Sequence, residues 1–462
     1  MDIKKQFKLI DAILAAVCIT LVAEAVVPTA SIGNSQYFWW IFLILSFCIP
    51  YGLVASELGS TYPSEGGLYT WVKNAYGIKW ASRVAWNYWV NFPIWIASLA
   101  ILFTDIIMGI FDIELSILWL IIIQLSYTWI VTFLGCFRIG ESKWLVNIGT
   151  FCKIVIMLSL GILGIYTFIK TGESANPINS YKDLLPSFDF HSLSFISVII
   201  FNFLGLEIVA TFAEDMKNPE KEIPKAIMIG SLLLAIFYLL PATGVNIAMD
   251  LDTAATATIP EAFGILLEKV GASLVVINSI VIIIGIMFIF TLFANIASWS
   301  FGVTSVAKFS ADDKGLPSFL TKVNNSGVPY VAAISNGVIA SIVLLAGIFI
   351  TYISEDASNL FWTFFSLSLI SLLYAYIAMF LSFKKLRKTD KTKRAYKVPG
   401  NKFVINLVTY VPMIILVTSI IFTIFVDFTL ESIISNIPLI IGIVLLLIGQ
   451  EIVVLNIKEE TK

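Results

Sequence analysis

Three ionisable residues lie inside long apolar stretches of this 462-residue chain. Glu24 follows the run LIDAILAAVCITLVA, Lys153 lies in IGTFCKIVIMLSL, and Glu207 lies in IIFNFLGLEIVA. At the centre of a bilayer each charge would cost roughly 2.5–3.5 kcal/mol, even on the scale derived from insertion experiments. Such residues therefore need a partner, and inside membrane segments they commonly mark the path of an ion or a substrate.

Glu24 stands four residues before Pro28. Proline has no N–H group, so it cannot donate to the carbonyl of residue 24. The stretch EAVVPTA (24–30) therefore combines a buried acid, a freed carbonyl and a helix break, and transporters place substrate sites at such breaks. We predict a site formed by Glu24 with its neighbours Ala23 and Ala25. The alternative is a proline kink whose acid bonds to an adjacent helix.

Glu207 has Gly205 beside it, and glycine permits close approach or unwinding of the backbone. We predict that both residues belong to the site, with Glu207 either contacting substrate or forming a gate. Trp299, in ASWSFG (297–302), lies deep in another apolar run. Its indole would offer a flat face to a cation, unless it serves only for packing.

Lys153 lies about ten residues into its apolar run, too deep for its ammonium group to reach water easily. Burial disfavours the charged form of a lysine, which would suit a role in proton coupling. The equally supported alternative is a static counter-ion for an acid such as Glu24.

The elements that position these residues follow from composition. Hydrophobic residues make up 58% of the chain and charged residues 13%, whereas a soluble domain has about 25% charged residues. Lipid cannot satisfy backbone polar groups, and the alternating pattern of a barrel is missing, so we predict an all-α membrane protein with twelve transmembrane helices. The predicted spans are 10–32, 37–58, 84–110, 115–136, 144–169, 192–214, 225–248, 272–304, 329–351, 358–383, 403–426 and 433–456.

The positive charges predict the orientation of these spans. Of the 29 Lys and Arg residues, 25 fall in one alternate set of connecting segments and three fall in the other, namely Lys170, Lys182 and Lys269. Cytoplasmic loops are enriched in Lys and Arg, so we predict a cell-membrane protein with both termini in the cytoplasm. We interpret the basic stretch KKLRKTDKTKRAYK (384–397) as a loop that fixes this topology; a nucleic-acid or lipid-headgroup patch is the alternative.

Other chemistry finds little support. His191 is the only histidine, and the four cysteines show no metal-ligand spacing, so we predict no metal and no cofactor. The chain contains no HExxH, GxSxG or P-loop motif, which argues against a membrane-embedded enzyme. The polar residues are too few to line a continuous channel. Nothing indicates a nucleic-acid partner.

Four ordered motifs carry a family resemblance over residues of about 60–460. They are ELGSTYPSEGGLYTWVKNAYG (57–77), FLGLEIVATFAEDMKNPEKEIPKAI (203–227), VAKFSADDKGLPSFLTKVNNSGVPY (306–330) and RAYKVPG (394–400). They resemble the loop and span signatures of amino acid–polyamine–organocation permeases, and the overall pattern is similar to bacterial amino acid/polyamine antiporters.

This resemblance implies a leucine-transporter-like fold, an inverted five-plus-five repeat over about 10–170 and 192–383. The repeat would lie in a ten-helix core (1–402), followed by spans 11 and 12 and a short cytoplasmic tail (403–462). The resemblance also implies discontinuous spans 1 and 6 and alternating access, as an exchanger or a proton symporter. A homodimer is compatible with it.

The resemblance also implies roles for particular residues. Phe201 and Trp299 fall where arginine–agmatine and putrescine–ornithine antiporters place aromatic rings around substrate, and Asn202 stands next to Phe201. Glu207 falls on a recurring acid of span 6. Lys153 looks like the span 5 lysine of proton-coupled relatives.

One departure from the family pattern concerns the substrate. Amino acid carriers of this family usually have a Gly-x-Gly break in span 1 that binds the substrate carboxylate, whereas this chain has VAEAVVPTASIG (22–33). An acid repels a carboxylate and attracts an amine. We therefore predict an antiporter for a cationic amine of the putrescine, agmatine or tyramine type, with the precursor amino acid as a candidate exchange partner. The alternative is a proton-coupled amino acid symporter.

Overall fold

The computed structural model describes residues 7–137, 139–354, 360–425 and 429–457. This part of the chain is helical and contains no β-sheet; its one β-bridge joins Phe7 to Met216. The predicted tail after residue 457 lies outside the described residues. The all-α prediction is confirmed.

Twelve helical segments in the described chain are long and apolar enough to cross a membrane, as predicted. Their bounds are Leu9–Ile32 (α1, η1, α2 and η2), Ser35–Thr61 (α3, η3 and α4), Ile78–Phe111 (α6), Ile117–Leu134 (α7), Ile139–Thr171 (α8), Phe190–Ala213 (α9 and most of η5), Pro219–Ala248 (α10), Leu274–Asp312 (α13), Tyr330–Ser354 (α14), Leu360–Thr389 (α15), Lys402–Ile424 (α16) and Ile437–Leu455 (α18).

Several helices extend beyond the predicted spans. The predicted starts of α6 and α10 were each six residues too late, and the predicted ends of α13 and α15 were eight and six residues too early. Hydropathy detects only the apolar part of a helix, and these extra turns contain charged residues. With 39 residues, α13 is roughly 58 Å long, about twice the hydrocarbon thickness.

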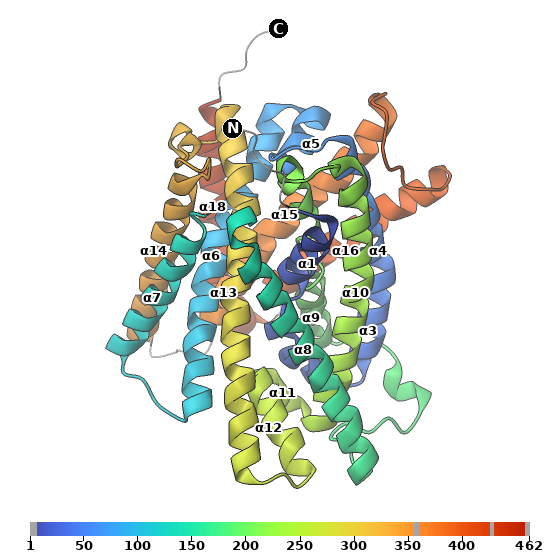
Figure 1. Cartoon of the computed structure of the whole chain (residues 1–462), viewed down its shortest axis with the longest axis vertical. Coiled ribbons are helices and arrows are strands. Elements are labelled where there is room, and N and C mark those ends of the chain that lie inside the picture. The colour runs from blue at the N-terminus through green and yellow to red at the C-terminus, as the bar shows by residue number, and fades with distance from the viewer. Residues whose placement is uncertain (1–6, 138, 355–359, 426–428, 458–462) are drawn as a thin grey trace.

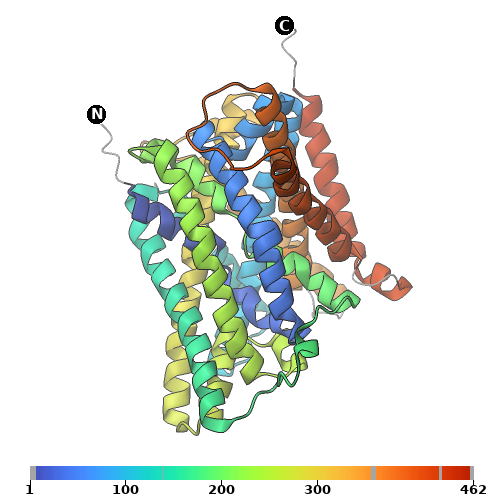
Figure 2. The same cartoon turned by 90° about the vertical axis from the view of Figure 1, so that its right-hand side faces the viewer.

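The long helices run side by side along the molecule (Figure 1). The short helix α5 (Gly67–Tyr76) lies at one end, and α11 (Leu251–Thr256) and α12 (Ile259–Lys269) lie at the other. The start of α1 and the end of α18 lie at the same end (Figure 2), as an even number of spans requires. Spans 1 and 6 form the centre, because 78% and 83% of their most apolar windows are buried, against 17% for α18.

Both central spans are interrupted, which confirms the expected discontinuity. In span 1, α1 (Leu9–Thr20) ends before η1 (Ala23–Ala25), α2 (Val26–Thr29) and η2 (Ala30–Ile32). In span 6, α9 (Phe190–Phe201) is followed by Gly205 at φ +109° and the 3₁₀ helix η5 (Leu206–Asp215).

The position of the first break corrects the prediction. The sequence placed it within 24–30, after Glu24, but the helix already ends at Thr20 and restarts at Ala23. Pro28 lies inside the short α2, within the first turn, where the missing N–H is tolerated.

Candidate functional site

The first break is bridged by a tyrosine. Backbone groups at this depth have no water to bind, so side chains must satisfy them. The hydroxyl of Tyr238, on α10, donates to the carbonyl oxygen of Thr20 at 2.8 Å and accepts from the N–H of Val22 at 2.7 Å. One side chain therefore holds both sides of the interruption.

Lys153, on α8, also binds the end of α1. Its Nζ donates to the carbonyl oxygen of Cys18 at 2.8 Å and to that of Leu21. The side chain is fully buried. Lys153 therefore caps the carbonyl end of α1, where the helix dipole favours a positive charge.

Two residues of α13 complete this cap. The amide nitrogen of Asn295 lies 3.1 Å from the carbonyl oxygen of Cys18 and 3.2 Å from that of Ile19. The indole N–H of Trp299 donates to the carbonyl of Ile19 at 3.1 Å. The predicted site residue Trp299 thus contacts the break. The contact is made by the indole N–H, whereas the sequence suggested that the ring face would meet a cation.

Glu24, just beyond the break, stands apart from this network. Both of its carboxylate oxygens are buried, and neither has a hydrogen-bond partner among the described residues. Ala23 and Ala25 on either side are buried. No ion pair within the described chain joins Glu24 to Lys153, although the two charges interact at longer range. The acid is therefore buried without a direct partner.

A second unpartnered group lies near Glu24. The hydroxyl of Tyr127, on α7, is buried without a hydrogen-bond partner in the described chain and interacts electrostatically with Glu24. Its ring packs against Phe103 and Phe293, each with a centroid 4.9 Å away. Tyr127 was not predicted to belong to the site, because its only signal in the sequence is a hydroxyl deep in an apolar span.

Glu207 has a very different environment, formed by tyrosines. Its carboxylate accepts hydrogen bonds from the hydroxyls of Tyr51, on α4, and Tyr88, on α6, the latter at 2.6 Å. The hydroxyls of Tyr51 and Tyr376, on α15, each accept from the N–H of Gly205 at 3.1 Å. We call Glu207 with these three tyrosines the Glu207 cluster. None of the three tyrosines was predicted from the sequence.

Gly205 brings the two breaks into contact. A Cβ at this position would lie 2.5 Å from Cγ2 of Ile19 and 2.9 Å from the ring of Trp299. Only glycine fits this approach, and its positive φ is also disfavoured for other residues. Glycine therefore lets the end of α1 and the start of η5 touch.

The remaining predicted residues lie at the end of α9. The ring of Phe201 packs edge-on against Trp95 at 5.0 Å and Phe365 at 4.9 Å. The side-chain amide of Asn202 is buried, and neither its nitrogen nor its oxygen has a hydrogen-bond partner in the described chain. Asn202, like Glu24, therefore has buried polar atoms without hydrogen-bond partners in the described chain. Phe201 instead belongs to an aromatic group between α6 and α15.

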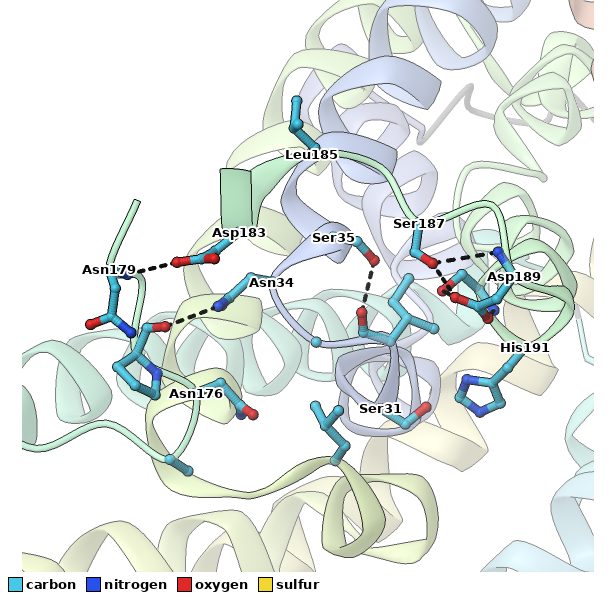
Figure 3. A pocket seen from close by; sticks show the side chains of 16 residues that line it. Ser31, Asn34, Ser35, Asn176, Asn179, Asp183, Leu185, Ser187, Asp189 and His191 are labelled. Carbon is cyan, nitrogen blue, oxygen red and sulfur yellow. Dashed lines mark hydrogen bonds between the residues drawn. The ribbon is translucent and has the colours of Figure 1, made fainter. Parts of the chain in front are cut away.

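Two cavities flank this central region. One, of about 600 Å³, lies between the end of span 1 and the segment 175–192; Figure 3 shows that Ser31, Asn34, Asp183, Asp189 and His191 line it. Hydrogen bonds from the backbone N–H groups of Ser180 and Asn179 lower the pKa of Asp183, so its carboxylate is ionised at neutral pH.

The other cavity, of about 330 Å³, lies beside the last turns of η5, where Thr211, Phe212 and Asp215 line it. Glu24 and Glu207 line neither cavity. Buried polar groups thus lie in the interior, with a cavity beyond each broken helix.

The described chain has twelve spans, and two of them are interrupted where they touch in the centre. Interrupted helices that meet in this way are typical of secondary transporters. The sequence model of the amino acid permease family matches residues 7–448. The chain therefore belongs to the amino acid permease family.

Relatives in this family include carriers of amines and of amino acids. The chain is 40% identical to the "probable agmatine/putrescine antiporter AguD" of Lactococcus lactis, over 98% of this chain and 95% of the relative. It is 25% identical to the "putrescine transporter PotE" of Haemophilus influenzae, over 66% and 68% of the two chains. It is 24% identical to the "glutamate/gamma-aminobutyrate antiporter" of Lactococcus lactis, over 78% and 71%.

Proposed function

We propose that this permease is an antiporter that exchanges cationic amines of the agmatine and putrescine type by alternating access. One observation supports the substrate class above all others: the carboxylate of Glu24 is buried next to a broken helix without a hydrogen-bond partner. A buried carboxylate is strongly destabilising unless it is paired, and an ammonium or guanidinium group supplies both a charge and hydrogen bonds.

Lys153 does not meet this need. Its ammonium group binds two carbonyl oxygens of α1, and no ion pair joins it to Glu24 in the described chain. In this proposal Lys153 stabilises the break, while Glu24 binds the amine. Asn202, whose amide is also buried and unpartnered, contributes further polar contacts.

The relatives agree with this substrate class. A relative that is 40% identical over nearly the whole chain is named as a probable agmatine/putrescine antiporter, and a more distant one as a putrescine transporter. Carriers named for acidic amino acids are 24% identical, about as similar as the putrescine transporter, so the support comes from the relative at 40% identity.

The arrangement of the helices supports alternating access. The breaks fall in spans 1 and 6, the first span of each predicted repeat (about 10–170 and 192–383). The two flanking cavities would be the end points of the pathway, each connected in turn to the buried carboxylates. We place both termini in the cytoplasm of a cell-membrane carrier, because 25 of 29 Lys and Arg residues occupy that set of segments.

Proton-coupled amino acid symport is the second candidate. A fully buried lysine at the break favours it, since such a group can change protonation during transport. With an imposed proton gradient, a symporter would accumulate substrate into vesicles that contain no substrate, whereas an exchanger would require substrate inside them.

Counterflow in proteoliposomes tests the proposal. Vesicles loaded with unlabelled putrescine should accumulate radiolabelled agmatine without a pH gradient, and vesicles loaded with buffer alone should not. At agmatine concentrations near or below KM, Glu24→Gln should strongly reduce this accumulation, while Glu268→Gln, at an exposed carboxylate on α12, should leave it intact. Full activity of Glu24→Gln, or uptake of neutral amino acids driven only by a pH gradient, would refute the proposal.

A further inference from the structure

An apolar cavity of about 170 Å³ lies between α5, the start of α6 and α15, away from the central site. We call it the α15 groove. It is lined by Val72, Tyr76, Trp80, Tyr374, Ile377, Ala378 and Leu381. These side chains offer hydrocarbon and aromatic surface and almost no polar atoms to an occupant.

The groove lies where α6 and α15 leave the apolar zone. Trp80 is 51% exposed and lies in the first turn of α6. On α15 the apolar sequence ends at Phe383 and is followed by Lys384 and Lys385. Tyrosine and tryptophan next to Lys and Arg are typical of the boundary between hydrocarbon and headgroups. The rim of the groove, at Trp80 and Lys385, would therefore lie at headgroup level.

Cations lie over two rings of the groove. The Nζ of Lys385 lies 4.2 Å from the ring centre of Tyr76, and the guanidinium of Arg83 lies 5.0 Å from that of Trp80. Arg83 also forms two hydrogen bonds with Glu451, at 2.8 and 2.9 Å, which offset its charge. No carboxylate contacts Lys385 within the described part of the chain. Its positive charge therefore stands at the rim without an acidic partner.

We propose that the α15 groove binds an anionic phospholipid, with part of an acyl chain between α5 and α15 and the phosphate at Lys385. Charge complementarity selects this occupant. A zwitterionic phospholipid would bring its own ammonium group to Lys385 together with its phosphate, and inorganic phosphate would leave the apolar groove unfilled. The basic segment 384–397 thus acquires a lipid-binding role at its first residues, in addition to its predicted effect on topology.

Such a lipid would contact the helix that forms one wall of the Glu207 cluster. Tyr374 and Ile377 face the groove, while Tyr376, in the same turn of α15, binds the N–H of Gly205 in the interior. Occupancy of the groove is therefore expected to influence the position of Tyr376. The lipid site does not involve the transported substrate. The lipid proposal is therefore independent of the proposed exchange activity.

Lipid titration of the full-length protein in detergent tests the proposal. Native mass spectrometry would count bound phosphatidylglycerol and, in parallel, bound phosphatidylcholine. We expect the unmodified protein to retain phosphatidylglycerol preferentially. Lys385→Gln should weaken that retention about fivefold, the effect expected for one cation at a charged membrane surface. Lys391→Gln, further along the same basic segment, should not change it.

A second variant tests the apolar half of the site. Ala378→Trp would fill the groove and should reduce retention of phosphatidylglycerol while Lys385 is still present. The melting temperature of Ala378→Trp without lipid shows whether this variant folds. If Ala378→Trp does not fold, Lys385→Gln still tests the proposal. Equal retention of both lipids, equal weakening by Lys391→Gln, or a dimer that forms through this face would overturn the proposal.

Discussion

The two buried carboxylates differ in their partners. The Glu207 side chain accepts hydrogen bonds from two tyrosine hydroxyls, whereas the oxygens of Glu24 accept none from the described residues. A carboxylate that is already bonded gains little from a ligand, and an unbonded one gains much. We therefore propose that Glu24 binds substrate and that Glu207 acts in gating.

This difference predicts distinct kinetic defects. Glu24→Gln removes the charge that pairs with the amine, so KM for agmatine should rise about tenfold or more, as expected for a charged hydrogen bond. Glu207→Gln keeps an acceptor for the tyrosine hydroxyls but disturbs the cluster, so turnover should fall with a smaller change in KM. Initial exchange rates over a range of agmatine concentrations separate the two effects. Identical defects in both variants would contradict the assignment.

Lys153 provides a second test at this scale. Lys153→Met removes both hydrogen bonds to the α1 carbonyls, which should destabilise the protein by about 2–4 kcal/mol and abolish exchange. Lys153→Gln retains an amide donor and should keep measurable exchange. Thermal unfolding and counterflow at several pH values provide the readouts. If Lys153→Gln exchanges normally but loses a pH dependence that the unmodified protein shows, proton coupling is the better interpretation.

The charged residues were recognisable in the sequence, but their partners were not. A carboxylate in an apolar run violates the hydropathy pattern, so Glu24 and Glu207 stand out. Tyrosine is compatible with apolar spans, so nothing distinguished Tyr88 or Tyr376 from their neighbours. The partners also come from distant spans; Tyr238 bonds to Thr20 across 218 positions of the chain. Only the tertiary structure brings such pairs together.

At the scale of helices, the site depends on how closely the two broken spans approach. Gly205 allows this approach, because its missing side chain leaves room for Ile19 and the ring of Trp299. The carbonyl end of α1 is held in turn by side chains from α8, α10 and α13. The breaks are therefore fixed by their surroundings.

Gly205→Ala should consequently be severely destabilising. The new methyl group would lie 2.5 Å from Ile19, on a backbone at φ +109° that costs about 1–3 kcal/mol for other residues. We expect lower expression, a lower melting temperature and no exchange. Gly172→Ala is the matched control: its φ is also positive, at +72°, but no atom lies within 4 Å of the new methyl group. Equal losses in both variants would show that backbone strain, not the contact between the breaks, is decisive.

Hydropathy predicted the existence of every span, because burial in lipid imposes a strong and continuous pattern. It could not predict where α13 or α15 ends, since a helix continues past the bilayer on local hydrogen bonds. It also misplaced the first break, because Pro28 suggested an interruption that α2 accommodates, while Thr20 and Leu21 have no breaking tendency of their own.

At the scale of the whole molecule, charge and cavities define two unlike ends. The end where α1 starts and α18 ends also contains α5, and the opposite end contains α11, α12 and the cavity with Asp183 (Figures 1 and 3). An ionised carboxylate at the mouth of that cavity attracts cations from solution. If this end faces outward, an incoming amine meets a negative site before it reaches Glu24.

The orientation can be tested with single cysteines in a variant whose four native cysteines are replaced by serine. Ser180 and Thr392 are both exposed, and they lie in segments that the charge distribution assigns to opposite sides. Ser180→Cys should react with a membrane-impermeant maleimide on intact cells. Its segment belongs to the connecting segments that are predicted to lie outside the cell, which together contain only three of the 29 Lys and Arg residues. Thr392→Cys should react only after the membrane is permeabilised, which also shows that the thiol is accessible. The reverse pattern would place the basic segments outside, and the cavity with Asp183 would then attract amines from the cytoplasm instead.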